Sequence, residues 1–356
     1  MITSDEIKSL AESFGFDACG ITRAEPVPEA EKRLKSWLEE GSHGTMKYLE
    51  NFEARAKKFW ESFPEAKSII VVGVNYYSNH PVIASTAKRG EAIPSIIFLS
   101  KDRDSPRGAI SSKIASASLE SPPRNDAHPV GRVARYAWGK DYHGVIRKRL
   151  EEFREKLCEM AGREIRAEIC VDTKPLLERS IAQKAGLGFI GKQSQLLNPK
   201  FGPWLFLAEL VTDLELEPDT PFIGSCGTCR ICIDECPTQA IRPEGGIDAR
   251  RCIAYLTIEH KGEIAENLRP LVGDWVFGCD ICLEVCPYSS KAKETQWPEL
   301  AAESGQGPFL DLLKLFQIPS NRTYKREFEG RAILRANRKQ LRRNAEIVLQ
   351  NGGFPC

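Results

Sequence analysis

Eight of the twelve cysteines in this 356-residue chain fall within residues 226–286, and their spacing constrains the fold more than any other feature. The first run, Cys226-Gly-Thr-Cys-Arg-Ile-Cys-Ile-Asp-Glu-Cys-Pro237, has the complete C-x2-C-x2-C-x3-C-P spacing in which thiolates hold [4Fe-4S] clusters. The second run, Cys279-Asp-Ile-Cys-Leu-Glu-Val-Cys-Pro287, has only the last part of this pattern, with Val276 where a full repeat would begin. Cys252 lies upstream and can supply the missing thiolate.

In this arrangement the fourth cysteine of a run crosses to the other cluster. One cluster is therefore predicted on Cys226, Cys229, Cys232 and Cys286, and the other on Cys236, Cys252, Cys279 and Cys282. Zinc is the alternative, because C-x-x-C pairs also bind zinc tetrahedrally. The three closely spaced cysteines, and the Cys-Pro that ends both runs, favour clusters. Two neighbouring clusters can carry electrons, so a site that receives those electrons is expected elsewhere in the chain.

Composition and charge exclude several classes of protein. With 42% hydrophobic and 28% charged residues, the chain can bury at least one core, which excludes a disordered protein. The formal charge of +1 points to neither a nucleic acid nor a membrane for the chain as a whole. Residues 68–74, the longest apolar stretch, are too few to span a bilayer, and residues 1–6 lack the features of a signal peptide. We therefore expect a soluble, cytosolic protein without a membrane partner.

The chain is expected to consist of three parts. Residues 1–220 alternate helical and extended patterns, which predicts an α/β or α+β domain. Within it, residues 78–131 are rich in serine and proline and are predicted to be an inserted loop with one strand at 95–99. Residues 221–295 form the cysteine-rich module, and residues 296–356 are predicted to be a mainly helical tail. In the first domain, helices are expected at 4–14, 28–40, 141–161 and 175–185, and strands at 17–22, 67–77, 163–171 and 203–214.

The tail carries a concentrated positive charge. Residues 320–344 contain nine lysines and arginines, among them Arg338, Arg342 and Arg343, against two glutamates. This is a local charge of +7 in a chain whose total is +1. A solvated helix face is the ordinary explanation for such a run, and contact with RNA is the functional one. A second pattern, Gly186-Leu-Gly-Phe-Ile-Gly191, fits the dinucleotide-binding fingerprint but follows a predicted helix, so we interpret it as a helix stop and a loop.

Taken together, these segments resemble the epoxyqueuosine reductase family, cobalamin and iron–sulfur enzymes that complete queuosine at the wobble position of certain tRNAs. Besides the two cysteine runs, the matching segments are residues 135–143 (RYAWGKDYH), 171–179 (VDTKPLLER), 185–192 (AGLGFIGK), 255–261 (YLTIEHK) and 341–344 (LRRN). The resemblance covers most of the chain outside the inserted loop. It implies an α+β fold, in which a cobalamin-binding domain similar to that of reductive dehalogenases is fused to a ferredoxin-like module with two clusters.

The resemblance also implies roles for individual residues. Cobalamin is expected to bind base-off, without a histidine ligand, although Asp126-Ala-His-Pro-Val-Gly131 fits a cobalt-ligating pattern. Corrin contacts are expected at Arg55, Arg135, Asp172, Lys192, Gln193, Ser194 and Leu196. The tRNA-facing surface is expected to include Tyr255, His260 and Lys261, together with Arg338, Arg342 and Arg343 of the tail. The implied partners are the anticodon stem-loop of tRNA and an external electron donor, and the protein is expected to be a monomer.

The resemblance singles out Asp172 as a proton donor. On sequence position alone, Asp172 follows a predicted strand and precedes a predicted helix, so an N-cap role is an equal alternative. To act as an acid near neutral pH, an aspartate needs a pKa above its ordinary value, and burial against an apolar macrocycle is one way to raise it. The expected reaction removes an epoxide oxygen as water, with two electrons and two protons.

Two other functions would account for part of the sequence. A reductive dehalogenase would use the same cofactors on a small organohalide, but such enzymes are typically exported with a twin-arginine leader, and no such leader is seen at residues 1–6. A ferredoxin-type electron carrier would leave the first 220 residues without a role. Cys19, Cys158, Cys170 and Cys356 are expected to be ordinary thiols.

Overall fold

A four-stranded antiparallel sheet organises the N-terminal half of the protein, in the order β1-β2-β7-β4. The computed structural model describes residues 2–79 and 129–354, so the predicted strand at 95–99 and the histidine pattern at 126–131 lie wholly or partly outside the described residues. The strands of this sheet are β1 (Ala18–Arg23), β2 (Ser68–Asn75), β4 (Ala167–Cys170) and β7 (Leu205–Thr212). The sheet is formed by residues on both sides of the gap, as expected if residues 78–131 are an insertion into the domain.

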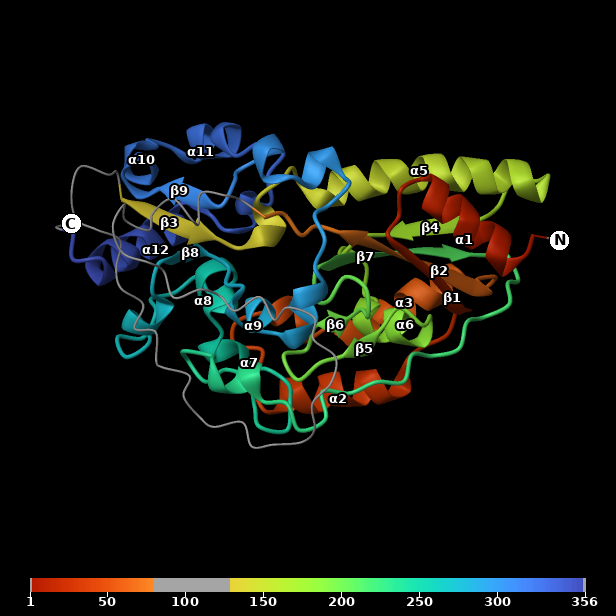
Figure 1. Ribbon diagram of the computed structural model, residues 1–356, viewed down its shortest axis with the longest axis horizontal. Helices are drawn as coiled ribbons and strands as arrows, with labels where there is room; N and C mark the ends of the chain where they lie inside the picture. The colour runs from red at the N-terminus through yellow and green to blue at the C-terminus, as the bar shows by residue number, and fades with distance from the viewer. Residues whose placement is uncertain (1, 80–128, 355–356) are drawn as a thin grey trace, which may run out of the picture. The chain divides into compact units, whose positions relative to one another are not determined.

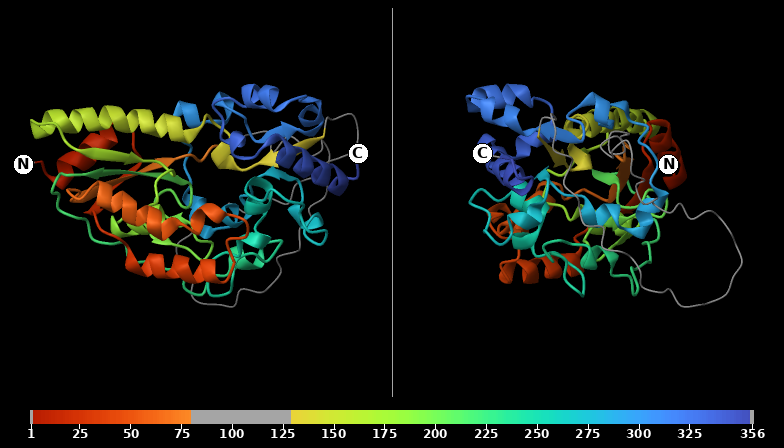
Figure 2. Two further views of the ribbon diagram at one scale, coloured as in Figure 1. Left: turned by 180° about the vertical axis from the view of Figure 1, so that it is seen from behind. Right: turned by 60° about the vertical axis from the view of Figure 1, so that its left-hand side comes forward.

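Helices cover both faces of this sheet, which explains why β2 is buried along its whole length. Ile70, Val72 and Val74 point to one face, where they pack with α1 (Ser4–Ser13) and α5 (Tyr142–Ala161). Ile69 and Val71 point to the other face, where they pack with α3 (Phe52–Ser62) and α6 (Glu178–Lys184). Figure 1 shows α5 and α1 on one side of the sheet and α3 and α6 on the other, and Figure 2 shows the same layers from behind, with α2 (Pro28–Glu39) beyond α3.

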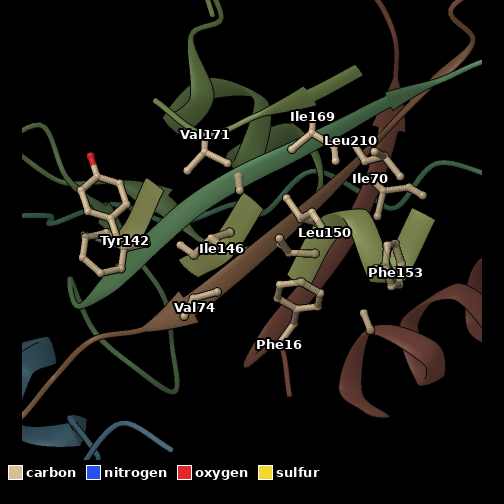
Figure 3. Close-up of a cluster of buried hydrophobic side chains, with 14 of the residues drawn as sticks. Phe16, Ile70, Val74, Tyr142, Ile146, Leu150, Phe153, Ile169, Val171 and Leu210 are labelled. Carbon is tan, nitrogen blue, oxygen red and sulfur yellow. The ribbon is translucent and has the colours of Figure 1, made fainter. Parts of the chain in front are cut away.

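The long helix α5 supplies much of the core on the first face. Ile146, Leu150 and Phe153 recur at helical spacing and are fully buried against the sheet. At the start of the helix, the ring of Tyr142 stacks on Phe206 of β7 with centroids 4.1 Å apart. Figure 3 shows Tyr142 at the edge of this cluster, with its hydroxyl group pointing away from the aliphatic side chains. The core therefore fixes the ring and leaves the hydroxyl free for polar contacts.

A second, three-stranded sheet joins segments that are far apart in the sequence. Its central strand β3 (Val130–Val133) pairs in parallel with β8 (Trp275–Phe277) and antiparallel with β9 (Phe309–Asp311). The helices α10 (Leu312–Gln317), α11 (Asn321–Glu327) and α12 (Arg338–Asn351) pack around it, and Val276, Leu310 and Leu341 share one core. The tail is thus not purely helical, because its strand β9 completes a sheet with the cysteine-rich segment and with β3, which begins at Val130, before the predicted end of the insertion.

Short elements make up the remaining segments. The hairpin β5 (Phe189–Ile190) and β6 (Leu196–Leu197) follows α6, and the cysteine-rich segment contains α7 (Ile231–Asp234), α8 (Ile253–Ile258) and α9 (Ile281–Glu284). Gly186 has a φ of +80° directly after α6, so the glycine pattern at 186–191 begins with a helix stop, as predicted. It continues into the strand β5 of the hairpin, where the sequence predicted a loop. The sequence also predicted α1, α2, α5, β1, β2, β4 and β7 to within a few residues, and it missed α3. Within the described ranges, no helix combines the length and the apolar character that a membrane crossing requires.

One core position breaks the apolar pattern. Glu209 lies in the middle of β7, opposite Val71 of β2 and Cys170 of β4, and it is fully buried. Leu207 and Val211 flank it on the same face of the strand and pack in the core beneath α3 and α6, so the Glu209 side chain points to that side as well. Neither carboxyl oxygen has a hydrogen-bond partner within the described chain. Burial therefore raises the pKa of Glu209 well above its ordinary value.

We expect the substitution Glu209→Gln to flatten the dependence of stability on pH. A carboxyl group whose pKa is raised on folding stays protonated in the folded state, so stability falls as the pH rises above the unfolded pKa. One such proton contributes up to about 1.4 kcal/mol per pH unit. The melting temperature of the intact protein should therefore fall more between about pH 5 and about pH 8 than that of the variant. Glu215→Gln, in the exposed ion pair with Lys67, is the control, and parallel curves for Glu209→Gln and the intact protein would contradict this account.

Candidate active site and cluster-binding cysteines

Asp172 lies in the loop between β4 and α6, in an unusual backbone conformation. Its φ of +50° falls in the left-handed region, which is unfavourable for a residue other than glycine. The residue that caps α6 is Leu177, so Asp172 is not an N-cap. Its side chain is 62% exposed and faces polar groups instead. Strained backbone of this kind is typical of functional sites.

Two side chains from the start of α5 reach the Asp172 carboxylate. The Tyr142 hydroxyl donates a hydrogen bond to Asp172 Oδ2 at 2.8 Å, and His143 Nε2 lies 3.8 Å from the same oxygen. Burial raises the pKa of Tyr142, so this phenol keeps its proton and acts as a donor. On its other side, His143 Nδ1 lies 2.7 Å from Asp141 Oδ1, and this hydrogen bond lowers the pKa of Asp141. The imidazole is thus held between two carboxyl groups.

Asp172 also lies among groups from distant parts of the chain. Its charge acts on Tyr48, Tyr136 and Arg335. The Arg335 guanidinium lies 5.5 Å from the centroid of the Tyr48 ring and its Nε donates to Glu259 Oε1 at 2.7 Å. Tyr48 is 45% exposed, so an aromatic face and a guanidinium are available beside the carboxylate. Such a pair can receive a planar, polar group.

The residues predicted to contact a corrin lie in different environments. Arg55 on α3 is exposed, whereas Arg135 is buried between the rings of Trp138 and Trp204, with its Nε donating to the carbonyl of Ser78 at 3.0 Å. Its Nη1 has no partner within the described chain.

The loop between β5 and β6 lies against the cysteines. Lys192 Nζ donates to the carbonyl of Cys229 at 2.8 Å, and Gln193 Nε2 lies 4.0 Å from Cys286 Sγ. Gln193 is buried, and its Oε1 has no partner in the described part of the chain. Ser194 has a φ of +64°, and Leu196 is buried at the start of β6. This loop therefore connects the cysteine-rich segment to the first domain.

The eight cysteines have two sets of neighbours. Cys226, Cys229 and Cys286 act electrostatically on the Cys232 thiol, while Cys236, Cys252 and Cys279 act on the Cys282 thiol. The two groups adjoin, because Cys232 packs in one small core with Cys236 and Cys282. The short helices α7 and α9, which contain Cys232 and Cys282, contact each other.

Their surroundings suit thiolate ligands of a bound cluster. Burial raises the pKa values of the Cys279 and Cys282 thiols well above the ordinary value of a cysteine. Thiolates at these two positions therefore need compensating positive charge. In residues 2–79 and 129–354, no three His, Cys, Asp or Glu side chains are placed to hold one metal ion. The division of the cysteines into two groups therefore rests on which of them are neighbours. Gly278, directly before Cys279, has a φ of +73° and lies close to Ala134. A Cβ atom at position 278 would lie 2.4 Å from the Cβ of Ala134, so only glycine fits there.

The residues predicted to face tRNA are only partly exposed. Tyr255 is buried, and its hydroxyl accepts the N–H of Thr45 at 2.7 Å. His260 Nε2 lies 2.9 Å from the carbonyl of Glu263, while Lys261 is exposed.

The arginines of α12 bind backbone carbonyls within the protein. Arg343 is buried and donates to the carbonyls of Leu256 and His260, at 2.6 and 2.8 Å. Arg342 and Arg338 both donate to the carbonyl of Ile318, at 2.7 and 3.0 Å. These contacts explain part of the basic run as structural. Beside Arg338, the exposed Lys325 and Arg326 of α11 line a surface cavity of about 720 Å³.

Several residues around Asp172 were not predicted as site residues. Tyr142 and Tyr48 approach it through the tertiary fold, and Glu178 binds its backbone from six residues along the chain. Glu259 was not predicted either, and it contacts Arg335. The sequence held a signal for Tyr142 and Glu178, because they lie in the segments 135–143 and 171–179 that carried the family resemblance. Tyr48 had no such signal.

Comparisons with known families match two parts of the chain. Residues 225–289 match the family model described as a 4Fe-4S double cluster binding domain, which includes all eight grouped cysteines. Residues 104–173 match the model described as epoxyqueuosine reductase QueG, DUF1730.

Full-length relatives and solved structures agree with these matches. The epoxyqueuosine reductase of Leadbetterella byssophila is 34% identical over 97% of this chain and 98% of its own length, and that of Xanthomonas campestris pv. campestris is 36% identical over 97% and 86%. The structure of the enzyme from Streptococcus thermophilus has a TM-score of 0.76 at 27% identity and covers 99% of this chain and 82% of that one. An epoxyqueuosine reductase in complex with a modified tRNA stem loop has a TM-score of 0.74 at 29% identity, with 98% and 81% covered.

The grouping of the cysteines predicts the effect of Cys252→Ser. Because Cys252 belongs to the second group, this variant should lose or degrade one cluster and keep the other, so that the anaerobically reconstituted protein binds roughly half the iron and sulfide of the intact protein. Iron and sulfide determination, with electron paramagnetic resonance of the reduced protein, measures this change. Cys158→Ser on α5 is the matched control and should leave both clusters in place. A full iron content in Cys252→Ser would remove Cys252 from the ligand set.

Proposed function

Since the chain belongs to the epoxyqueuosine reductase family, an oxidoreductase family, we propose that it reduces epoxyqueuosine to queuosine at the wobble position of tRNA. The observation that carries this proposal is the alignment with a named reductase over nearly the whole of both chains. A related structure holds an epoxyqueuosine-modified tRNA stem loop, which supports the anticodon stem-loop as the partner of this chain. We further propose that the protein acts as a monomer in the cytoplasm and receives electrons from an external donor.

Asp172 is the proton donor in this proposal. The reduction cleaves both carbon–oxygen bonds of the epoxide and consumes two electrons and two protons, so that the oxygen leaves as water. A carboxyl group that faces the substrate can protonate the departing oxygen, and the Tyr142 hydroxyl and His143 are placed to orient it. The related enzyme from Bacillus subtilis, with a TM-score of 0.75 at 27% identity, is described with its catalytic aspartate loop swung out of the active site. This supports a catalytic role for the corresponding loop here.

Two kinds of cofactor are part of the proposal. The two cysteine groups would hold [4Fe-4S] clusters, with the ligand sets given above, and these supply electrons one at a time. Cobalamin, bound base-off and without a histidine ligand, would supply the strongly reducing centre for the epoxide carbon.

The residues present fit a corrin. Its rim carries amide groups, which need both donors and acceptors. Gln193 and Arg135 offer a buried acceptor oxygen and a buried donor nitrogen that have no partner within the described chain. Gln193 also adjoins Cys286, which would place the corrin next to a cluster. We assign the contacts to Arg55, Arg135, Asp172 and the segment 192–196, as the family resemblance implies.

The surface of the tail offers a path for the tRNA backbone. Because Arg342 and Arg343 bind carbonyls within the protein, we assign phosphate contact chiefly to the exposed residues Lys325, Arg326 and Lys261, with Arg338 at the edge of the cavity. The guanidinium of Arg335 and the ring of Tyr48 lie closer to Asp172 and suit the modified base. Unpaired anticodon bases can turn out of the stack to reach such a site.

The proposed reaction is tested with protein reconstituted anaerobically with iron, sulfide and cobalamin. Incubation with a reductant and tRNA that carries epoxyqueuosine should convert the nucleoside to one lighter by a single oxygen, as measured by nucleoside mass spectrometry. Asp172→Asn should retain clusters and cobalamin but lose turnover by about a hundredfold or more, because an amide cannot supply the proton.

Asp5→Asn, in the first turn of α1, serves as the control. Unchanged turnover in Asp172→Asn would remove Asp172 from the mechanism. If clusters and cobalamin are bound but tRNA is not converted, the substrate is instead a small electrophile such as an organohalide.

The tRNA surface is tested by charge reversal on α11. Lys325→Glu with Arg326→Glu should weaken binding of the stem-loop about tenfold or more and reduce the slope of log Kd against log salt by about two, because two phosphate contacts are lost. The double variant Lys32→Glu with Arg33→Glu carries the same charge change on exposed residues of α2 and should bind nearly as the intact protein does. If both double variants lose stem-loop binding equally, the loss reflects the net charge of the protein and not phosphate contacts on α11.

A further inference from the structure

The conformation of Asp172 requires a group that holds it in place. Its left-handed backbone is unfavourable for an aspartate, and its side chain is exposed, so neither local preference nor burial fixes the loop. The Tyr142 hydroxyl and His143 contact only the carboxylate. The backbone at Asp172 must therefore be held by a different neighbour.

Glu178 is that neighbour. The N–H of Asp172 donates to Glu178 Oε1 at 2.7 Å, across a separation of six residues. Glu178 is the first residue of α6, and this helix is anchored in the core beneath the sheet by Ile181 and Ala182. The hydrogen bond therefore connects the loop to a rigid element.

The second connection of this loop is weaker. Lys174 forms an ion pair with Glu168 of β4, but both side chains are more than one third exposed. Exposed ion pairs of this kind contribute little to stability because solvent screens them. The contact with Glu178 is thus the main constraint on the loop backbone.

We propose that Glu178 is a positioning residue for the reaction: its carboxyl group holds the Asp172 backbone in the conformation that turns the Asp172 carboxylate toward Tyr142 and His143. This inference rests on the proposed role of Asp172 as the proton donor. Glu178 does not touch the substrate in this account. Without its carboxyl group the loop is free to leave the left-handed conformation, and the proton donor moves away from the substrate.

The surroundings of Glu178 make the strength of its hydrogen bond to the Asp172 N–H depend on pH. The titratable and charged groups that act on it or face it are Asp172 in the loop, Arg179 on α6, Glu209 on β7, Cys170 on β4 and Tyr142 on α5. Burial, and then the charge of Asp172, raise the pKa of Glu178 to about 8. An ionised carboxylate accepts a stronger hydrogen bond than a neutral carboxyl group does. The contact should therefore tighten as the pH rises through this range.

Three variants of the full-length, reconstituted protein test the proposal. Hydrogen–deuterium exchange of the peptide that contains residues 171–176 measures the loop, and single-turnover conversion of the modified tRNA measures its effect. Glu178→Ala should raise the exchange rate at Asp172 and lower the single-turnover rate, each by about tenfold, the effect of one hydrogen bond to a charged group. Glu178→Gln keeps an acceptor oxygen and should restore both values to within about threefold of the intact protein. Glu168→Ala, which removes the exposed ion pair with Lys174, should change neither.

A pH series distinguishes this role from simple packing. After correction for intrinsic exchange, protection at Asp172 in the intact protein should increase between about pH 7 and about pH 9, whereas Glu178→Gln should show no such increase. The binding of tRNA should be equal in all variants.

Other outcomes would overturn the proposal. It is wrong if Glu178→Ala leaves both exchange and turnover unchanged, or if Glu178→Gln shows the same pH dependence as the intact protein. If Glu178→Ala does not fold, the proposal is still tested by comparing the pH dependence of exchange in Glu178→Gln with that in the intact protein. A failure of the proposed function gives a different result. The intact protein would then not convert tRNA, or Asp172→Asn would be active, while the effect of Glu178→Ala on hydrogen–deuterium exchange would remain.

Discussion

The gathering of eight cysteines, two of them buried and six partly buried, is the constraint on which the rest of the structure depends. Buried thiolates need both positive charge and hydrogen-bond donors, and the chain surrounds them with contributions from several segments. The amide of Ala240 donates to Cys236 Sγ at 3.3 Å, and Gln193, from the first domain, lies against Cys286. Strand β8, directly before Cys279, is part of a sheet whose other strands come from the segments on either side of the cysteine-rich module in the chain. The cysteine-rich segment is therefore integrated with its neighbours and is not an appended unit.

This integration explains what could be predicted from the sequence. The two cysteine groups are predicted from spacing, because the C-x-x-C turn is a local structure and Cys252 is the one member assigned at a distance. Val276 takes the place of a first cysteine because it lies on β8 in the core of the second sheet. Strands β3 and β9 could not be predicted, since each has only three or four residues and is stabilised by its partners and not by its own pattern. Long, strongly periodic elements such as α5 and β2 were predicted because their apolar spacing is set by one extended contact surface.

The basic run shows why charge alone identifies a surface poorly. The guanidinium groups of Arg342 and Arg343 bind carbonyls at the ends of neighbouring elements, and Asn344 donates to the carbonyls of Thr257 and Val276 at 2.8 and 2.9 Å. The Leu-Arg-Arg-Asn segment thus connects α12 to the cysteine-rich segment, so it matters first for the fold. Charge on α11, where the side chains are exposed, is the part that remains available to a polyanion. A sequence pattern cannot separate these two uses, because both place arginine on a helix at similar spacing.

The candidate site itself is assembled from four separate segments that meet at Asp172. The loop after β4 carries the carboxylate, the start of α5 supplies Tyr142, the start of α6 supplies Glu178, and the tail supplies Arg335. Two of these side chains are fixed by contacts away from Asp172, since the Tyr142 ring stacks on Phe206 and Arg335 pairs with Glu259. Asp172 is the most exposed and the most strained member, and its partners are held by the core and by ion pairs. For the proposed role of Asp172 as a proton donor, this arrangement leaves the carboxylate open to a substrate while contacts elsewhere in the fold keep the groups that orient it in place.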